Sequence, residues 1–242
     1  MTISRNARFA LAALMGVGLS FIYIPLSVVV INSFNASRTF SWPPTHFTTE
    51  WWSKALTNTG VRDAIKWSVL AGLSATLIAL ALGTVLAFAV SRYQFFGREV
   101  ISLLVVLPIS LPGIVTGIAL NNAFTKQLGM STGLFTVIIG HATFCIVVVY
   151  NNAIARLRRM GTSLQEASMD LGANGITTFR LVTLPNLASA LFAGGLLAFG
   201  LSFDEIVVTT FTAGPGIQTL PIWIFNNLFR PNQAPIINVC LV

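Results

Sequence analysis

The sequence predicts an all-α protein whose helices form a polytopic transmembrane bundle, with five complete spans and the start of a sixth. Hydrophobic residues make up 55% of the chain and charged residues only 9%, whereas a soluble domain carries about 25% charged residues. Several apolar segments also reach about 20 residues, the length that a helix needs to cross a hydrocarbon core roughly 30 Å thick. We therefore expect residues 1–242 to form a single transmembrane domain.

The spans follow from the apolar runs. The first is preceded by Arg5 and Arg8 and is longer than the roughly 7 to 15 residues of a cleavable signal core, so we expect a retained helix with a kink at Pro25. The last run, 236–242, supplies only about 10 Å of helix, and we expect truncation inside that helix rather than a re-entrant stub. The expected spans are 9–31, 67–90, 100–124, 134–154 and 187–212, with a sixth starting near 235.

The third expected span contains Pro108, Pro112, Gly113 and Gly117. Proline frees helix carbonyls, which is tolerated at membrane depth where neighbouring helices or a polar cavity satisfy them. We therefore expect this span to face protein rather than lipid. Pro108 and Pro112 are candidate residues of a translocation pathway or gate.

The chain contains no motif for enzyme chemistry or for a metal. A phosphate-binding loop of the form G-x-x-x-x-G-K-[ST] and a G-x-S-x-G nucleophile elbow are both missing from the sequence. His46 and His141 are isolated, and Cys145 and Cys240 have no companion at metal-ligand spacing. His141 and Cys145 stand four residues apart, but two ligands do not make a zinc site. We expect no enzyme activity, cofactor or metal in this chain, so any energy source must come from another chain.

The basic residues predict the orientation, because Lys and Arg favour the cytoplasmic ends of spans. With a cytoplasmic N-terminus, the inner side holds Arg5, Arg8, Arg92, Arg98, Arg156, Arg158, Arg159 and Arg180, and the outer side holds Arg38, Lys54, Arg62, Lys66, Lys126 and Arg230. We therefore place the N-terminus inside. The net charge of +7 is scattered among loops, which indicates anchoring to anionic lipid headgroups rather than binding to nucleic acid.

A polar segment of about 30 residues, 156–185, separates the fourth and fifth spans and so lies in the cytoplasm. Ser163 and Glu166 have the spacing of a capping box, in which the serine hydroxyl accepts from the third helical amide and the glutamate returns a bond. A helical stripe at i, i+3, i+4, i+7 follows, and Gly172 is suited to end the helix. The stripe consists of Leu164, Ala167, Ser168 and Leu171. So short a helix is marginal alone in water, so its face should pack either on the protein's own loops or in a groove of a soluble subunit.

The run Glu166-Ala167-Ser168, Gly172 after it, and Val182-Thr-Leu-Pro185 closely resemble the EAA loop of inner-membrane permeases of binding-protein-dependent ABC importers. Ser168 and Val182 depart from the alanine and isoleucine of the family pattern. The resemblance implies a type I importer fold and a coupling helix docked on a cytoplasmic ATPase. The implied docking residues are Ser163, Leu164, Glu166, Ala167, Leu171 and Gly172.

The same resemblance implies a bacterial inner-membrane location and a set of partners. These are a second permease subunit in a homo- or heterodimer, two ATPase subunits that bind ATP-Mg, and an extracytoplasmic solute-binding protein.

Segments 32–38, 140–145 and 202–206 further resemble the spermidine/putrescine permease class, which implies a small cationic solute. Other importer solutes, such as 4-aminobutyrate or an organophosphonate, stay open. An ion-gradient-driven transporter is a less favoured alternative because no internal repeat is visible, and a membrane enzyme would need a catalytic cluster.

Asp204 and Glu205 are adjacent acids inside the fifth expected span, near its outer boundary. Ionisable residues in a span are costly and often functional, so at least one is a candidate to line the pathway and attract a cation. The alternative is that they cap loops or pair with Arg62, Lys66 or Arg230. Trp42, Trp51 and Trp52, in the outer loop, are expected to form an interfacial aromatic belt or a contact surface for the binding protein.

Overall fold

The computed structural model describes residues 4–38, 42–230 and 232–242, and these residues form helices, turns and one isolated antiparallel bridge, between Asn35 and Phe47. This confirms the predicted all-α class. The chain divides into two compact units, residues 1–62 with 223–242 and residues 63–222. Helices α3 (Thr59–Arg92) and α11 (Leu220–Asn227) each begin in one unit and end in the other.

The first unit contains α1 (Arg5–Ser33), α2 (Glu50–Thr57) and α12 (Ala234–Cys240), and α12 contacts both α1 and α2. The long apolar α1 continues through Pro25, and only Asn32 and Ser33, at its end, are buried. An 18-residue apolar window of α1 has no buried residue at all. This helix therefore offers its apolar surface to lipid or to another chain.

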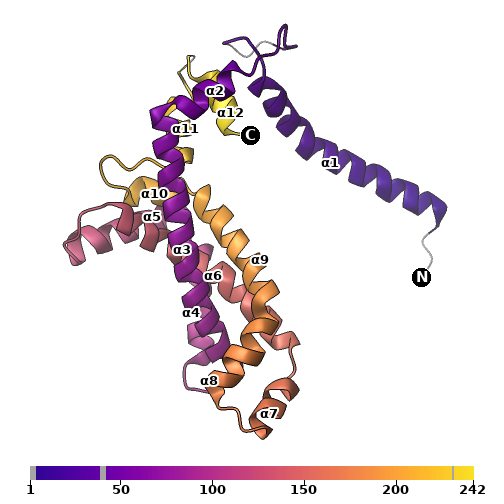
Figure 1. Ribbon diagram of the computed structural model, residues 1–242, viewed down its shortest axis with the longest axis vertical. Coiled ribbons are helices and arrows are strands. Elements are labelled where there is room, and N and C mark those ends of the chain that lie inside the picture. The colour runs from indigo at the N-terminus through magenta and orange to yellow at the C-terminus, as the bar shows by residue number, and fades with distance from the viewer. Residues whose placement is uncertain (1–3, 39–41, 231) are drawn as a thin grey trace. The chain divides into compact units, whose positions relative to one another are not determined.

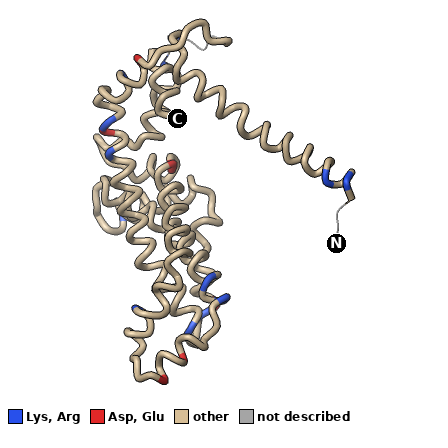
Figure 2. The backbone as a smooth tube through the Cα atoms, turned by 45° about the vertical axis from the view of Figure 1, so that its right-hand side comes forward, with Lys and Arg blue, Asp and Glu red and all other residues tan. Residues whose placement is uncertain are grey.

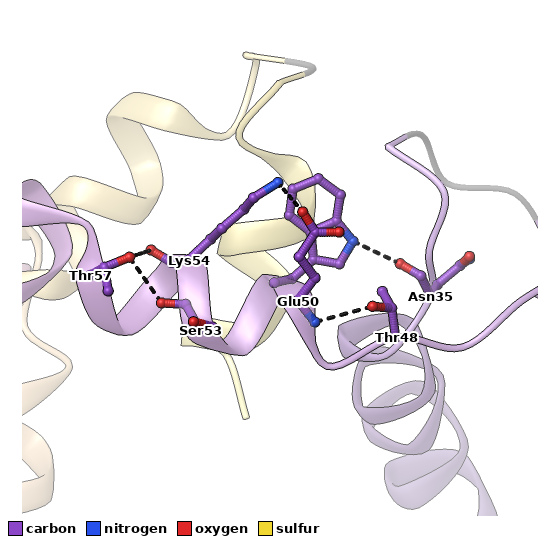
Figure 3. A network of polar contacts seen from close by, with 7 residues as sticks. Asn35, Thr48, Glu50, Ser53, Lys54 and Thr57 are labelled. Atoms are coloured by element: carbon purple, nitrogen blue, oxygen red, sulfur yellow. Dashed lines mark hydrogen bonds and ion pairs between the residues drawn. The ribbon is translucent and has the colours of Figure 1, made fainter.

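The start of α2 is fixed to the loop before it, as Figure 3 shows. The indole nitrogen of Trp51 donates to the backbone carbonyl of Asn35 at 3.1 Å, and the Glu50 amide donates to the Thr48 hydroxyl at 3.1 Å. Trp51 is buried, whereas Trp42 is 60% exposed. Trp51 is therefore a core residue of this unit and not part of an aromatic belt.

The second unit is built around α6 (Leu134–Arg159) and α9 (Leu184–Phe203), which run side by side (Figure 1), with α3 packed against the same core. Small residues make the close packing possible, because alanine and glycine let helix backbones approach. The core that joins these helices includes Ala75, Ala79, Ala142 and Ala198, all buried.

Four described helical segments are long and apolar enough to cross a membrane: Arg5–Ser33, Thr59–Arg92, Leu134–Arg159 and Gly175–Phe203. A bent pair, Arg98–Ser110 with Gly113–Gln127, would make a fifth crossing. These segments match the expected five spans in number and order. Figure 2 shows Lys and Arg residues of the second unit gathered near the end where α6 meets α7 (Ser163–Asp170).

The third span is not the continuous helix that the apolar run predicts. It breaks into α4 (Arg98–Ser110) and α5 (Gly113–Asn122), which continues into a π-helical turn, η1 (Ala123–Gln127), and the two halves meet at 106°. The cause is Pro112, which has no amide to donate and pushes Leu111 out of the helical region to ψ 146°.

The fifth span also differs from its prediction. It starts earlier, where α8 (Gly175–Thr178) and a π-helical turn, η2 (Phe179–Thr183), lead directly into α9, and it ends at Phe203 rather than at residue 212. A separate short helix, α10 (Val207–Thr212), follows the break. Asp204 and Glu205 therefore lie between two helices and not on one helix.

Candidate functional site

Helix α7 starts one residue earlier than the capping-box pattern predicts. Thr162 is the N-cap residue, without a side-chain cap bond, and Ser163 is the first helical residue. The third helical position is then Gln165 rather than Glu166, so the reciprocal pair of a capping box cannot form. The predicted Ser163–Glu166 box is wrong, although the helix itself is present.

The end of α7 is the one that the sequence predicts. Gly172 has φ +86°, in the left-handed region that favours glycine. Its amide donates to the carbonyl of Met169 at 2.9 Å, and the amide of Ala173 donates to that of Ser168 at 3.1 Å. These two bonds form a Schellman motif, so Gly172 fixes where the helix stops and where the chain turns toward α8.

Polar side chains attach α7 to the rest of its unit. Gln165, the buried residue of the helix, donates from Nε2 to Thr183 Oγ1 at 2.9 Å. The hydroxyls of Ser168 and Thr178 lie 3.0 Å apart, and Arg156 Nε donates to the carbonyl of Asn186 at 3.2 Å. The segment between α6 and α9 is thus folded back on the ends of both helices.

The apolar residues of α7 point the other way. Leu164 is 57% exposed and Leu171 is 90% exposed, and Ser163, Glu166 and Ala167 are exposed as well. Within the described residues, Leu164, Ala167 and Leu171 of this stripe therefore do not pack on the protein's own loops, whereas Ser168 contacts Thr178. An apolar groove of about 600 Å³ lies beside α8, between that helix and the end of α3. Its lining residues are Val85, Phe88, Tyr93, Asn174, Gly175, Ile176 and Phe179.

The structure brings the two helix breaks of the second unit together. A Cβ built on Gly113, the first residue of α5, would lie 3.4 Å from Val207, the first residue of α10. Asn121 Nδ2 donates to the backbone carbonyl of Phe211 and fixes α5 against α10 further along. Pro112 precedes Gly113 directly, whereas Pro108 lies inside α4, one turn before the break.

The two acids have different roles at their break. The carboxylate of Glu205 accepts from the backbone amide of Val208 at 2.9 Å, so this side chain caps the start of α10. Asp204 ends α9, is exposed, and makes no side-chain hydrogen bond or ion pair with any residue that the structure describes. Glu205 thus fits the capping alternative, whereas the carboxylate of Asp204 makes no such contact within the described residues.

Two functional groupings escape the sequence analysis. Gln165 and Thr183 orient α7, but a lone glutamine in a polar helix gives no signal until the fold shows what it faces. His141, treated as isolated because it has no third metal ligand, is fully buried and hydrogen-bonded to Ser202 and Thr209. His141 and Ser202 lie in segments 140–145 and 202–206, which resemble the spermidine/putrescine permease class. That resemblance is the sequence signal that could have pointed to this pair.

Comparison with known proteins places this geometry in a family. Residues 79–241 match the model of the binding-protein-dependent transport system inner membrane component. The chain is 33% identical to the putrescine transport system permease protein PotI of Escherichia coli K12, over 91% of this chain and 80% of that one. It is 32% identical to the spermidine/putrescine transport system permease protein PotC of Haemophilus influenzae, over 93% of this chain and 87% of that one.

A third relative carries a different name. The putative 2-aminoethylphosphonate transport system permease protein PhnV of Salmonella typhi is 29% identical, over 88% of this chain and 81% of that one. Among solved structures, a bacterial ABC transporter for the import of the acidic polysaccharide alginate matches with TM-score 0.73 and 15% identity, over 100% of this chain and 93% of that one. The MetNI methionine ABC transporter matches with TM-score 0.55 and 20% identity, over 75% of this chain and 84% of that one. These two structures support the fold.

Proposed function

The chain belongs to the family of binding-protein-dependent transport system inner membrane components, and from this membership we propose that it forms the translocation pathway for a small cationic solute, a polyamine such as putrescine or spermidine. It is an ABC importer permease, a multi-pass inner-membrane transport subunit without catalytic chemistry of its own. ATP is bound and hydrolysed on a separate subunit of such a transporter.

The observation that carries the proposal of ATPase docking is the orientation of α7. Its polar residues Gln165 and Ser168 bond to its own chain, while Leu164 and Leu171 are exposed. An exposed apolar face on a short, fixed helix is the pattern of helix-in-groove docking. We assign Ser163, Leu164, Glu166, Ala167, Leu171 and Gly172 to the docking surface for the ATPase subunit.

The groove beside α8 extends this surface, because Ile176 in its lining is 80% exposed. The segment 156–185 then acts as a rigid lever. Closure of an ATPase dimer moves α7, and the bond from Gln165 to Thr183 passes the motion to the end of η2 and so to the start of α9. The bond from Arg156 to Asn186 passes it on from α9 to the end of α6. In this arrangement the N-terminus and this segment are cytoplasmic. A second permease, two ATPases and a solute-binding protein complete the importer.

The helix breaks support a pathway at α5 and α10. Irregular backbone at membrane depth is tolerated where it is buried in protein or lines a water-filled cavity. Both breaks occur in apolar spans, and Gly113 and Val207 bring them together. The carboxylate of Asp204 stands at this place without an internal partner among the described residues, so it supplies negative charge for an ammonium group.

The second candidate solute is 2-aminoethylphosphonate, which the PhnV relative favours. This compound carries an amine together with an anionic phosphonate, and the phosphonate would be repelled by Asp204. Polyamines carry ammonium groups alone, so the exposed acid favours them. The higher identity to the two polyamine permeases points in the same direction.

Uptake assays test this function. The complex of this chain with its partner subunits is reconstituted in proteoliposomes, and labelled putrescine, spermidine and 2-aminoethylphosphonate are offered with the binding protein, with and without internal ATP. We expect putrescine or spermidine uptake that requires ATP and is insensitive to proton and sodium gradients. Uptake driven by an ion gradient in the absence of ATP would overturn the proposal.

A further inference from the structure

A buried histidine connects the two sides of the α9–α10 break. His141 lies on α6 and its side chain is completely buried. Nδ1 lies 2.7 Å from the hydroxyl of Ser202, near the end of α9, and Nε2 lies 2.8 Å from the hydroxyl of Thr209, in α10. One imidazole thus bonds to both helices that flank Asp204 and Glu205.

The hydrogen-bond pattern defines which nitrogen carries the proton. The Thr209 hydroxyl donates its hydrogen to the backbone carbonyl of Glu205 at 2.6 Å, so its oxygen must accept from Nε2–H of His141. In the neutral ring, Nδ1 is then the acceptor for the hydroxyl of Ser202. In that state a chain of donors runs from Ser202 through His141 and Thr209 to the main chain at Glu205.

This chain of bonds reaches the charged residues indirectly. The carbonyl that accepts from Thr209 belongs to Glu205, whose carboxylate caps α10 at Val208, and Asp204 is the residue before it. The packing here is close as well, since a Cβ on Gly140 would lie 3.1 Å from Val208 Cγ1. A movement of α10 relative to α9 would have to break a buried hydrogen bond of His141, and buried polar groups are costly to leave unpaired.

We propose that His141 is a positioning residue of the transport pathway, locking the α9–α10 break so that Asp204 is presented to the solute. The proposal rests on the proposed function of Asp204. A histidine with only a structural role would stabilise the folded helices and do no more. In this proposal the clamp, His141 with Ser202 and Thr209, also controls how the α9–α10 break opens during the transport cycle.

The chain supplies matched controls for the test. Thr209→Val removes the hydroxyl that His141 bonds to while keeping the shape of the side chain. Thr210 is its neighbour on α10, is exposed, and donates to the carbonyl of Ile206 at 2.8 Å in the same way, but makes no hydrogen bond with His141. Thr210→Val is therefore the control for Thr209→Val, and the exposed His46 provides His46→Gln as the control for changes at His141.

The first readout does not depend on the solute. Asp204→Cys is introduced into a Cys240→Ser background of the reconstituted complex, and labelling of position 204 by a membrane-impermeant thiol reagent is followed by mass spectrometry with and without ATP. A buried hydrogen bond that differs between two states shifts their ratio about fivefold to tenfold when it is lost. We expect Ser202→Ala, Thr209→Val and His141→Phe each to change the labelling rate by about fivefold or more. Thr210→Val and His46→Gln should leave it within about twofold of the parent.

The second readout is uptake per assembled complex, measured with Asp204 intact. His141→Gln, whose amide nitrogen reaches about as far as Nε2, should retain more uptake than His141→Phe, and Thr209→Ser should match the parent. The double variant His141→Phe with Thr209→Val should have the same uptake as His141→Phe alone, because the two substitutions remove the same clamp. If Thr209→Val and Ser202→Ala lower only the assembled fraction, and the assembled complex labels and transports like the parent, the clamp proposal is overturned. Failure of polyamine uptake in the parent as well would count against the proposed solute and leave the labelling result to decide on His141.

Discussion

Gln165 donates a hydrogen bond to Thr183 at 2.9 Å, and both side chains are buried. This one contact determines which side of α7 faces its own chain. Because Gln165 points inward, Leu164 and Leu171 lie on the outer side of a helix whose other end is fixed at Gly172. The polar residue is inside and the apolar residues are outside, the reverse of an ordinary surface helix.

Replacing Gly172 should uncouple ATP hydrolysis from uptake. Alanine at φ +86° is strained by about 1 kcal/mol, and aspartate adds a charge at the expected ATPase contact. We expect Gly172→Ala to reduce the solute transported per ATP hydrolysed and Gly172→Asp to abolish transport. Gly129→Ala is the control, because Gly129 also has a left-handed φ, +63°, and nothing within 4 Å of an added Cβ, but lies outside the docking surface. Native coupling in Gly172→Asp would argue against a docking role for this turn.

The exposed face of α7 should be needed for assembly but not for folding. Leu171→Glu removes a side chain that is 90% exposed in this chain, so the fold of the permease should be unchanged. If the ATPase buries this leucine, its loss costs about 2 kcal/mol, or roughly thirtyfold in affinity. Copurification of the ATPase measures this. Leu128 is also exposed, but it lies in the loop before the start of α6, at the end of that helix remote from α7. The ATPase should therefore copurify normally with Leu128→Glu. Equal recovery of ATPase with both variants would contradict the assigned surface.

Asp204 and Glu205 should respond differently to neutralisation. Asp204→Asn removes a charge that has no internal partner in the described structure, so we expect uptake of a cationic solute to fall about tenfold through a higher KM. Glu205→Gln keeps an oxygen that can accept from the Val208 amide, so its effect should be small, whereas Glu205→Ala should destabilise α10 by about 1 kcal/mol. Initial rates of uptake over a range of solute concentrations separate these cases. Unchanged kinetics in Asp204→Asn would remove the electrostatic role of that residue.

An exposed ion pair in the first unit gives a pH-dependent prediction. Lys54 Nζ lies 2.6 Å from Glu50 Oε1, and this bond lowers the pKa of Glu50 below its usual range. Because the pKa is lower in the folded than in the unfolded state, the pair stabilises above the unfolded pKa, and that contribution is lost as the pH falls through the folded pKa. Lys54→Met should raise the pKa of Glu50. Added salt should also raise it, by a smaller amount, in the unsubstituted protein, because both side chains are exposed and salt screens their attraction. Carboxyl NMR titration of Glu50 in detergent micelles measures this, and an unchanged pKa in Lys54→Met would exclude the ion pair as its cause.

The parts of the fold that sequence analysis predicted are those with a local cause. Apolar runs long enough to cross a bilayer define the spans, and the end of α7 follows from Gly172, because one residue in a left-handed conformation stops a helix. The start of α7 was misplaced by one residue, since Thr162 and Ser163 are both good caps and the choice depends on where Gln165 can find a partner.

The helix breaks were less predictable. Pro108 and Pro112 were identified as unusual, yet hydropathy runs unbroken through both, so it gives no sign of a 106° bend. The break between Phe203 and Val207 is also hard to predict from hydropathy. It depends on the side chain of Glu205, which caps the start of a new helix. The contact between the two breaks and the bonds of His141 join residues that are more than 60 positions apart, and such pairing appears only when the helices are packed.

The most direct test of the central claim is the ATPase activity of the purified complex. The chain is purified with its co-assembling subunits, and ATP hydrolysis is measured with the binding protein empty or loaded with putrescine, spermidine, 4-aminobutyrate or 2-aminoethylphosphonate. We predict that an ATPase copurifies and that the binding protein loaded with a polyamine stimulates it more than the other loaded forms do. A complex without a copurifying ATPase would contradict the account.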